Sequence, residues 1–423
     1  MTQMKMNSGL RWAVVVSVMA ATAACDTSVT NPGPVQDPFL DEAAAQPAVV
    51  AGMGRALSEA MNWIGYTSAA VSREIHPAGS TGSFGISARW QRGELDPTDD
   101  ALNTHWNEAQ QARWFAENGL ARMEEAAPDS MRLLALANLY AGYSNRLLGE
   151  NMCEAIIDGG PIQASSEFLN RAEQFFTRAF EIGTGDVKTA AIAGRASVRV
   201  GLDKWAEAAA DAGTVATSFA YSLSYFDVGQ EAQRNRIQWA INNTPYRAHT
   251  QWNTWVESYF TATGDERVRY RTTTLTGDAA IDCCGRVPFY PQDKFPSPAS
   301  AVPLSSGAEM RLIEAENMLR ASDFQGALGK INDVRTAAGV ETVTGGSVNE
   351  VWTRLKRERA IVLWLEARRM GDLRRWQAAN APGDLDPLET PTGDASTGSH
   401  LEKQDLCFPV PRSERDTNPN LRG

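Results

Sequence analysis

The stretch from Glu358 to Trp376, ERAIVLWLEARRMGDLRRW, places five arginines and three carboxylates around an aliphatic run. Arginines left free on one helix face would bind phosphate, and paired carboxylates could carry acid–base chemistry. An active site would also need a nucleophile or base that this stretch does not hold. We therefore interpret the stretch as structural, with its carboxylates neutralising its arginines.

Helix-ending signals divide this stretch. Glu366 faces Arg369 at a spacing of three residues on a helix. Gly371 followed by Asp372 predicts that one helix ends at the glycine and that another begins with Asp372 as its cap. The apolar side chains earlier in the stretch are expected to fill the interior: Ile361, Trp364 and Leu365.

Other residue patterns give little support for catalysis. The four histidines are scattered, and the chain contains no HExxH, GxSxG or GxxxxGK[ST] motif. Adjacent carboxylates such as Glu124 and Glu125 occur, but no pair has a defined separation. We expect no enzyme activity, no cofactor and no metal. An exported helical hydrolase and a repeat protein that only scaffolds other proteins remain the alternatives.

The N-terminus has the pattern of an export signal. Lys5 and Arg11 precede the apolar run WAVVVSVMAATAA, which ends immediately before Cys25. We expect a signal peptide over 1–24, and Cys25 resembles the acylated cysteine of a bacterial lipobox. The following residues, rich in Pro, Gly, Asp and Thr, predict a lipidated flexible tether over 25–40.

The remaining cysteines then lie in an oxidising compartment, where disulfides persist. They are Cys153, Cys283, Cys284 and Cys407. A bridge between the adjacent pair would force unusual backbone geometry, so we expect Cys283 and Cys284 each to join Cys153 or Cys407. No CxxC motif or nearby histidine supports a metal site.

The charge balance argues against nucleic acid as a partner. The chain carries a formal net charge of −11, and removal of the signal, with its two basic residues and no acids, makes it −13. A surface of this sign repels phosphate backbones.

Helical periodicity dominates two blocks, about 99–220 and 306–378. Three anchor pairs repeat at a spacing of 119 residues: Ala196 with Ala315, Trp205 with Phe324, and Ala208 with Ala327. Small residues at helix crossings with an aromatic after the turn follow tetratricopeptide logic. The sequence predicts a mostly α fold, with a tetratricopeptide-like scaffold interrupted by irregular insertions at about 62–98 and 221–305.

The chain resembles the SusD/RagB family of outer-membrane lipoproteins. The family's late helix is matched by Glu358, Arg359, Glu366, Arg368, Asp372, Leu373, Arg375 and Trp376. Its closing segment is matched by Pro411, Glu414, Asn418, Pro419 and Asn420. GDERV at Gly264 to Val268 is similar to the family's middle motif, and AEMRLIEAENML to the helix before the last repeat. The resemblance implies a single SusD-like domain over 41–423 that closes with a segment at 379–423.

The resemblance implies a cell-surface lipoprotein of the outer membrane that captures an oligosaccharide and delivers it to a SusC-like, TonB-dependent transporter. A peptide ligand stays open. Sugar capture needs flat aromatic faces beside polar groups, and such aromatics lie in the insertions. The candidates are Trp63, Tyr66, Phe84, Trp90, Trp252, Trp255, Phe289 and Tyr290. Trp106, Trp114, Trp205 and Trp364 lie within periodic helices, so we expect them in the core.

Overall fold

The computed structural model describes residues 37–79, 88–229, 231–242, 247–281, 283–392 and 401–421. The predicted signal peptide, Cys25 and Phe84 lie outside these residues. The helices are α2 (Gln46–Val71), α3 (Ala88–Gln91), α4 (Leu102–Ala126), α5 (Met131–Asn151), α6 (Ser166–Ile182), α7 (Gly185–Gly201), α8 (Trp205–Ala212), α9 (Arg236–Asn242), α10 (Trp255–Thr263), α11 (Gly307–Arg320), α12 (Phe324–Ala337), α13 (Val348–Val362), α14 (Arg369–Ala378) and α15 (Arg412–Thr417). The fold is mostly α, as predicted. Across the described ranges, no helix combines the length and apolar character needed to cross a membrane.

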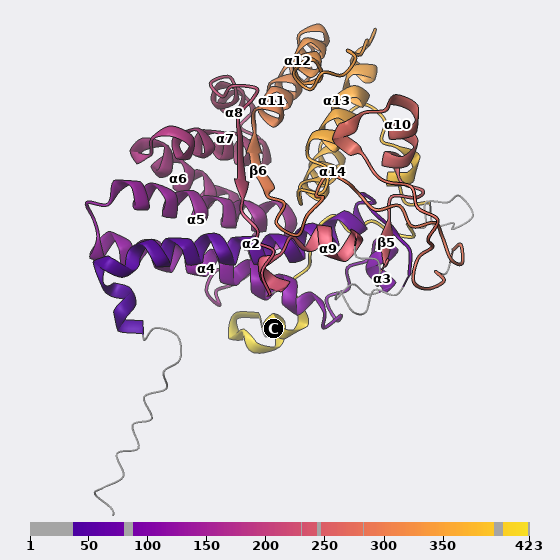
Figure 1. Ribbon diagram of the computed structural model, residues 1–423. Coiled ribbons are helices and arrows are strands. Elements are labelled where there is room, and N and C mark those ends of the chain that lie inside the picture. The colour runs from indigo at the N-terminus through magenta and orange to yellow at the C-terminus, as the bar shows by residue number, and fades with distance from the viewer. Residues whose placement is uncertain are drawn as a thin grey trace, which may run out of the picture.

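Successive helices of the first block, α4 to α8, pack as neighbours and form the stack seen in Figure 1. Close packing of α5 on α6 depends on a small residue at the crossing. A Cβ added to Gly142 in α5 would lie 2.7 Å from the ring of Phe176 in α6, closer than real contacts allow. Phe176 is itself fully buried, so it has no room to withdraw.

The predicted repeat is present as two helix pairs with the same internal geometry. The first helices, α7 and α11, end at Gly201 and Arg320, and the second helices, α8 and α12, begin at Trp205 and Phe324. Each turn contains one residue in the left-handed region, Asp203 at φ 59° and Ser322 at φ 65°. Helices α8 and α11 also pack together, so the second pair continues the stack of the first.

The six strands are short and form three antiparallel pairs. They are β1 (His76–Pro77), β2 (Glu154–Ala155), β3 (Gln163–Ala164), β4 (Ala220–Leu223), β5 (His249–Thr250) and β6 (Val302–Ser306). Pairing of β1 with β5 joins the first insertion to the second, and pairing of β4 with β6 joins the two ends of the second insertion. The insertions therefore pack against each other although they are far apart in the sequence.

The charged stretch at 358–376 does not break where we predicted. Helix α13 ends at Val362, five turn residues follow, and Gly371 lies inside α14. The break instead uses Leu365 and Ala367, which both have a positive φ of 60°. Gly371 serves a close approach, because a Cβ there would lie 3.2 Å from the carbonyl oxygen of Glu150.

The disulfides also differ from expectation. Cys153 pairs with Cys407, and Cys283 pairs with its neighbour Cys284, a vicinal bridge that we had considered unfavourable. The pairing follows from which cysteines the fold places next to each other. Cys153 follows α5, and its backbone N–H donates to the carbonyl of Phe408, so Cys407 lies beside Cys153. Cys283 and Cys284 therefore have only each other as partners.

The last residues of the predicted tether take part in the fold. Asp37–Asp41 forms a short 3-10 helix beside α4. Arg122 in α4 donates to Asp37 Oδ1 at 2.9 Å and to Asp41 Oδ1 at 3.0 Å. The two ion pairs therefore hold this short helix against α4.

Candidate functional site

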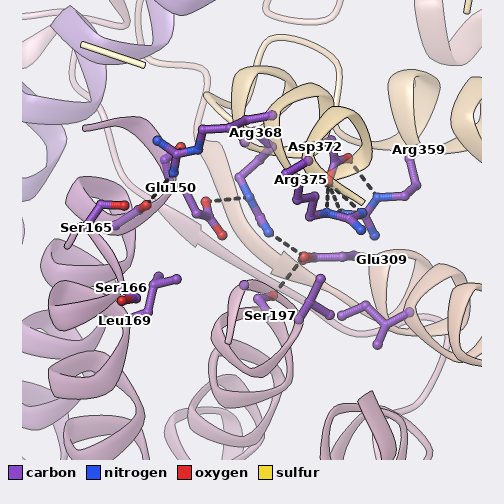
Figure 2. Close-up of a pocket in the computed structure, with 17 residues that line it drawn as sticks. Glu150, Ser165, Ser166, Leu169, Ser197, Glu309, Arg359, Arg368, Asp372 and Arg375 are labelled. Atoms are coloured by element: carbon purple, nitrogen blue, oxygen red, sulfur yellow. Dashed lines mark hydrogen bonds and ion pairs between the residues drawn. The ribbon is translucent and has the colours of Figure 1, made fainter. Parts of the chain in front are cut away.

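The charged stretch lines a cavity of about 210 Å³ between the helical blocks (Figure 2). Its walls come from the end of α5, the start of α6, α7, α11, α13 and α14. The polar and charged lining residues are Glu150, Ser165, Ser166, Ser197, Glu309, Arg359, Arg368, Asp372, Arg374 and Arg375. Histidine, cysteine, lysine and aromatic side chains are absent from this lining, which consists of described residues.

Arg368 joins three elements across this cavity. Its guanidinium contacts Glu150 Oε2 at 2.8 Å and Glu309 Oε1 at 2.7 Å, and Ser197 Oγ donates to the same Glu309 oxygen at 2.7 Å. Burial alone would raise the pKa of Glu309, but Arg368 and Arg146 outweigh burial and lower it. The carboxylate therefore stays ionised and fixes α7, α11 and α14 relative to one another.

Asp372 forms the second buried cluster. It accepts from Arg359 Nε at 2.7 Å and from Arg375 Nη2 at 2.9 Å. Burial by itself would raise the pKa of Asp372, but the two guanidinium groups hold it well below its usual range. The predicted neutralisation within the stretch holds only for Asp372 with Arg359 and Arg375. Arg368 and Arg369 pair with carboxylates outside the stretch, and Arg374 donates to backbone carbonyls. Glu366 pairs with Lys294 at 2.7 Å and not with Arg369.

The chemistry of this cavity is structural. Its charged groups are largely committed to one another, and its volume is below the roughly 300–1,000 Å³ typical of small-molecule sites. Glu74, which accepts from the Leu365 N–H at 2.9 Å, has its pKa raised to about 7 by burial, but it lies outside the cavity lining. The lining therefore provides no activated nucleophile.

Three of the predicted ligand aromatics, Tyr66, Trp252 and Tyr290, lie where the two insertions meet. Tyr66 in α2 is hydrogen-bonded to His249 Nδ1 of β5 at 2.7 Å. The ring of Trp252 lies edge-on to His76 of β1, with ring centroids 5.2 Å apart. The Tyr290 N–H donates to Thr250 Oγ1 at 2.8 Å. The structure thus brings residues from both predicted insertions into one region.

Burial divides these candidates. Tyr66, Trp90 and Trp255 are fully buried and Phe289 is 1% exposed, so these four rings fill the core and present no face to a ligand in this structure. Trp63, Trp252 and Tyr290 are partly exposed. Arg236 covers one face of Trp63 at 3.8 Å, and Tyr290 stacks on Tyr270 at 5.6 Å.

The four tryptophans assigned to the core also divide. Trp106 and Trp364 are buried as predicted. Trp205 is partly buried, with Arg320 over its ring at 3.8 Å. Trp114 is 47% exposed, so its assignment to the core is wrong. It lies 8 residues after Trp106 in α4, which at 3.6 residues per turn rotates it about 80° away from the buried stripe.

Histidines and acids of the described residues form no metal centre: no three of His, Cys, Asp or Glu there are arranged to hold an ion. His105 and His249 are fully buried, and burial lowers the pKa of each to about 3. Both stay neutral at physiological pH and act as buried hydrogen-bond partners, His105 to Thr67 Oγ1 at 2.6 Å and His249 to Tyr66.

The sequence and the fold were compared with known protein families and solved structures. Residues 307–422 match the model of the SusD family. The fold is that of a SusD/RagB family protein from Bacteroides thetaiotaomicron, with a TM-score of 0.62 at 13% identity over 88% of this chain and 94% of that chain. The C-terminal part of this chain therefore matches the SusD family model, and the fold of the chain resembles that of SusD/RagB family proteins.

Two further SusD-type structures are similar at the level of fold. A SusD-like carbohydrate binding protein from Bacteroides vulgatus has a TM-score of 0.61 at 14% identity, covering 90% of this chain and 97% of that chain. A structure with xylogluco-oligosaccharide has a TM-score of 0.65 at 14% identity, covering 89% and 98%. None of the curated proteins compared with this chain matches it.

The family match contains α11 to α15, and therefore most of the charged cavity. It does not include the insertions at 62–98 and 221–305, where the partly exposed aromatics lie. The matched region thus contains most of the charged groups that join the helices around the cavity, whereas the candidate ligand contacts belong to segments outside the match.

Proposed function

We propose that this chain is a member of the SusD/RagB family: a non-catalytic, cell-surface lipoprotein that captures an oligosaccharide and delivers it to a TonB-dependent, SusC-like transporter in the outer membrane. The observation that carries the proposal is the family fold, which this chain shares over 90% of its length with a SusD-like carbohydrate binding protein. The structure with xylogluco-oligosaccharide supports a saccharide as the ligand class.

The region where the insertions meet supplies contacts that a sugar ring needs. Trp252 and Tyr290 are partly exposed and lie beside the polar backbone and hydroxyl groups around Thr250. Flat aromatic faces pack against sugar C–H groups, and neighbouring amides and hydroxyls bind sugar hydroxyls. In the same region, burial keeps His249 neutral, and its Nδ1 is bonded to Tyr66.

Calorimetry on residues 26–423 tests the capture role. We expect at least one neutral oligosaccharide among xylogluco-, malto- and manno-oligosaccharides to bind without release of reducing ends. Trp252→Ala and Tyr290→Ala should each weaken binding about three- to tenfold, the loss expected for one aromatic contact. Phe39→Ala removes a ring that is 52% exposed at the start of the described chain, and serves as the matched control.

Two results would contradict this proposal. Turnover of a bound saccharide would favour the exported hydrolase. Binding of peptides from a control panel, with no saccharide bound, would change the ligand class. Because calorimetry and product analysis use the same samples, the two outcomes are separable.

The proposed anchor is an acylated Cys25, which directly follows the apolar run WAVVVSVMAATAA. Cells given an alkyne-labelled fatty acid should label the wild-type protein and leave Cys25→Ala unlabelled and released from the membrane fraction. Mild detergent extraction of the wild-type membranes should co-purify a barrel transporter. Retention of labelled Cys25→Ala in the membrane would disprove the anchor, and extraction without any transporter would disprove the partner.

A further inference from the structure

A stripe of amides and one tryptophan runs along the outer face of α4. Asn107, Gln110, Gln111 and Trp114 occupy positions separated by three, four and seven residues, which places them on one helix face. Asn107 and Gln111 are exposed, and Trp114 is 47% exposed. A solvent-facing helix position more often carries a charged residue than a tryptophan, so this ring needs an explanation.

The stripe forms one wall of an open groove of about 510 Å³. The opposite walls are the turn at 156–159 and α15 of the C-terminal segment, which lies beside α4 in Figure 1. The groove is lined by Trp106, Asn107, Glu108, Gln110, Gln111, Arg113, Trp114, Ile156, Asp158, Gly159 and Glu414. Its volume falls in the range of small-ligand sites, roughly 300–1,000 Å³.

The far wall is held in place by the C-terminal family motif. Asn418 Nδ2 donates to the Gly160 carbonyl at 3.0 Å, and Asn420 Nδ2 donates to the Gly159 carbonyl at 2.7 Å. On the near side, Gln110 Nε2 donates to the Ile156 carbonyl at 2.9 Å. The groove is therefore preorganised, and a ligand would lose little affinity to ordering its walls.

Some polar side chains of the groove are already hydrogen-bonded within the protein, and others are not. Arg113 is bound to Asp158 at 2.6 Å, and Glu414 accepts from Asn418 at 3.1 Å. The side chains of Asn107, Glu108 and Gln111 make no hydrogen bond within the described residues. Uncommitted amides beside an aromatic face suit a ligand with many hydroxyl groups, since amides can both donate and accept.

Charge narrows the ligand class. The lining carries three carboxylates, Glu108, Asp158 and Glu414, against the single guanidinium of Arg113. An anionic ligand would meet net negative charge and an arginine that is already paired. A neutral ligand meets no such penalty.

We infer that this groove is a second saccharide site, in which Trp114 stacks on a neutral sugar ring and Asn107 and Gln111 bind its hydroxyl groups. The inference rests on the proposed capture of saccharides, but it places binding on the first helical block, away from the insertions. Two sites on one chain would hold an oligosaccharide more tightly than either site alone, provided the saccharide can span both.

Titration of residues 26–423 with the three neutral oligosaccharides and with an oligogalacturonate, followed by calorimetry and saturation-transfer NMR, tests the site. Trp114→Ala should weaken binding of a neutral oligosaccharide about tenfold, and Gln111→Ala should weaken it less. Phe115→Ala is the matched control, because this ring is 43% exposed, lies 5.6 Å from Trp114, and does not line the groove. Binding of a neutral ligand should change little with NaCl concentration.

Unfolding midpoints of all variants separate binding from folding, and both substituted side chains are exposed. Unchanged affinity in Trp114→Ala and Gln111→Ala, with loss in Trp252→Ala or Tyr290→Ala, would overturn the groove site and leave the capture function standing. Tighter binding of oligogalacturonate than of neutral probes would overturn the ligand class. Failure of the wild type to bind any saccharide would overturn both proposals.

Discussion

Replacing both Cys153 and Cys407 by alanine should lower the free energy of unfolding by about 5 kcal/mol. The bridge joins residues 254 apart in the sequence, so its loss releases a very large loop in the unfolded chain. It also frees the segment that carries α15 and the groove wall, because Met152 and Phe408 meet as an isolated β-bridge beside it. Urea unfolding of wild type and variant under oxidising conditions gives the difference directly.

The vicinal pair provides the matched control. Cys283→Ala with Cys284→Ala removes the same number of sulfur atoms, but the bridge closes a loop between adjacent residues and constrains almost none of the unfolded chain. Its loss should change the free energy of unfolding by less than about 1 kcal/mol. A reducing agent should bring the wild type to the stability of the Cys153/Cys407 variant. Equal losses for the two double variants would refute this account.

Asp372→Ala should cost about 3–5 kcal/mol of stability, because it leaves buried arginines without their shared carboxylate. Arg359 is 2% exposed and loses both of its hydrogen bonds to Asp372, at 2.7 and 2.9 Å. Arg375 retains Glu316, so it is affected less. Saccharide affinity of the folded fraction should stay within about twofold, since Asp372 touches neither insertion.

The exposed pair Arg412 and Asp416 is the control for this substitution. Its separation is 3.2 Å, but the side chains are 67% and 64% exposed, so Asp416→Ala should cost less than about 1 kcal/mol. The pH dependence has a defined sign. Because the pKa of Asp372 is lowered in the folded state, its stabilisation is present above the unfolded pKa near 3.9 and is lost as the pH falls further. A wild-type advantage that grows on acidification would contradict the ion pair.

The helical scaffold could be predicted because its signals are local. Spacing of apolar and small residues showed the helix pairs, and the offset of 119 residues reappears in the ends of α7 and α11 and in the starts of α8 and α12. The helix break after Val362 was missed because it depends on distant partners. Glu74 binds the N–H of Leu365, and Lys294 binds Glu366, and neither contact leaves a mark in the local sequence.

Burial of single aromatics was harder to predict than the helices that carry them. Trp114 has helical neighbours on both sides in the sequence, yet its side chain is 47% exposed, and only the packing of the helices decides this. Tyr66 and Phe289 lie in segments that read as loops or loop edges, but pairing of β1 with β5 closes the insertions over them. The disulfides were missed for a related reason, because only the fold brings Cys407 to Cys153.

The pairing of β1 with β5 limits how binding specificity can be transplanted between relatives. His76 of one insertion is aligned with Thr250 of the other, and Tyr66 is bonded to His249 across the same junction. A chimaera that exchanges only 62–98 would place a foreign strand against β5 and remove the partner of a buried histidine. A chimaera must therefore exchange 62–98 and 221–305 together. We also expect that relatives with different ligand specificities differ in both segments.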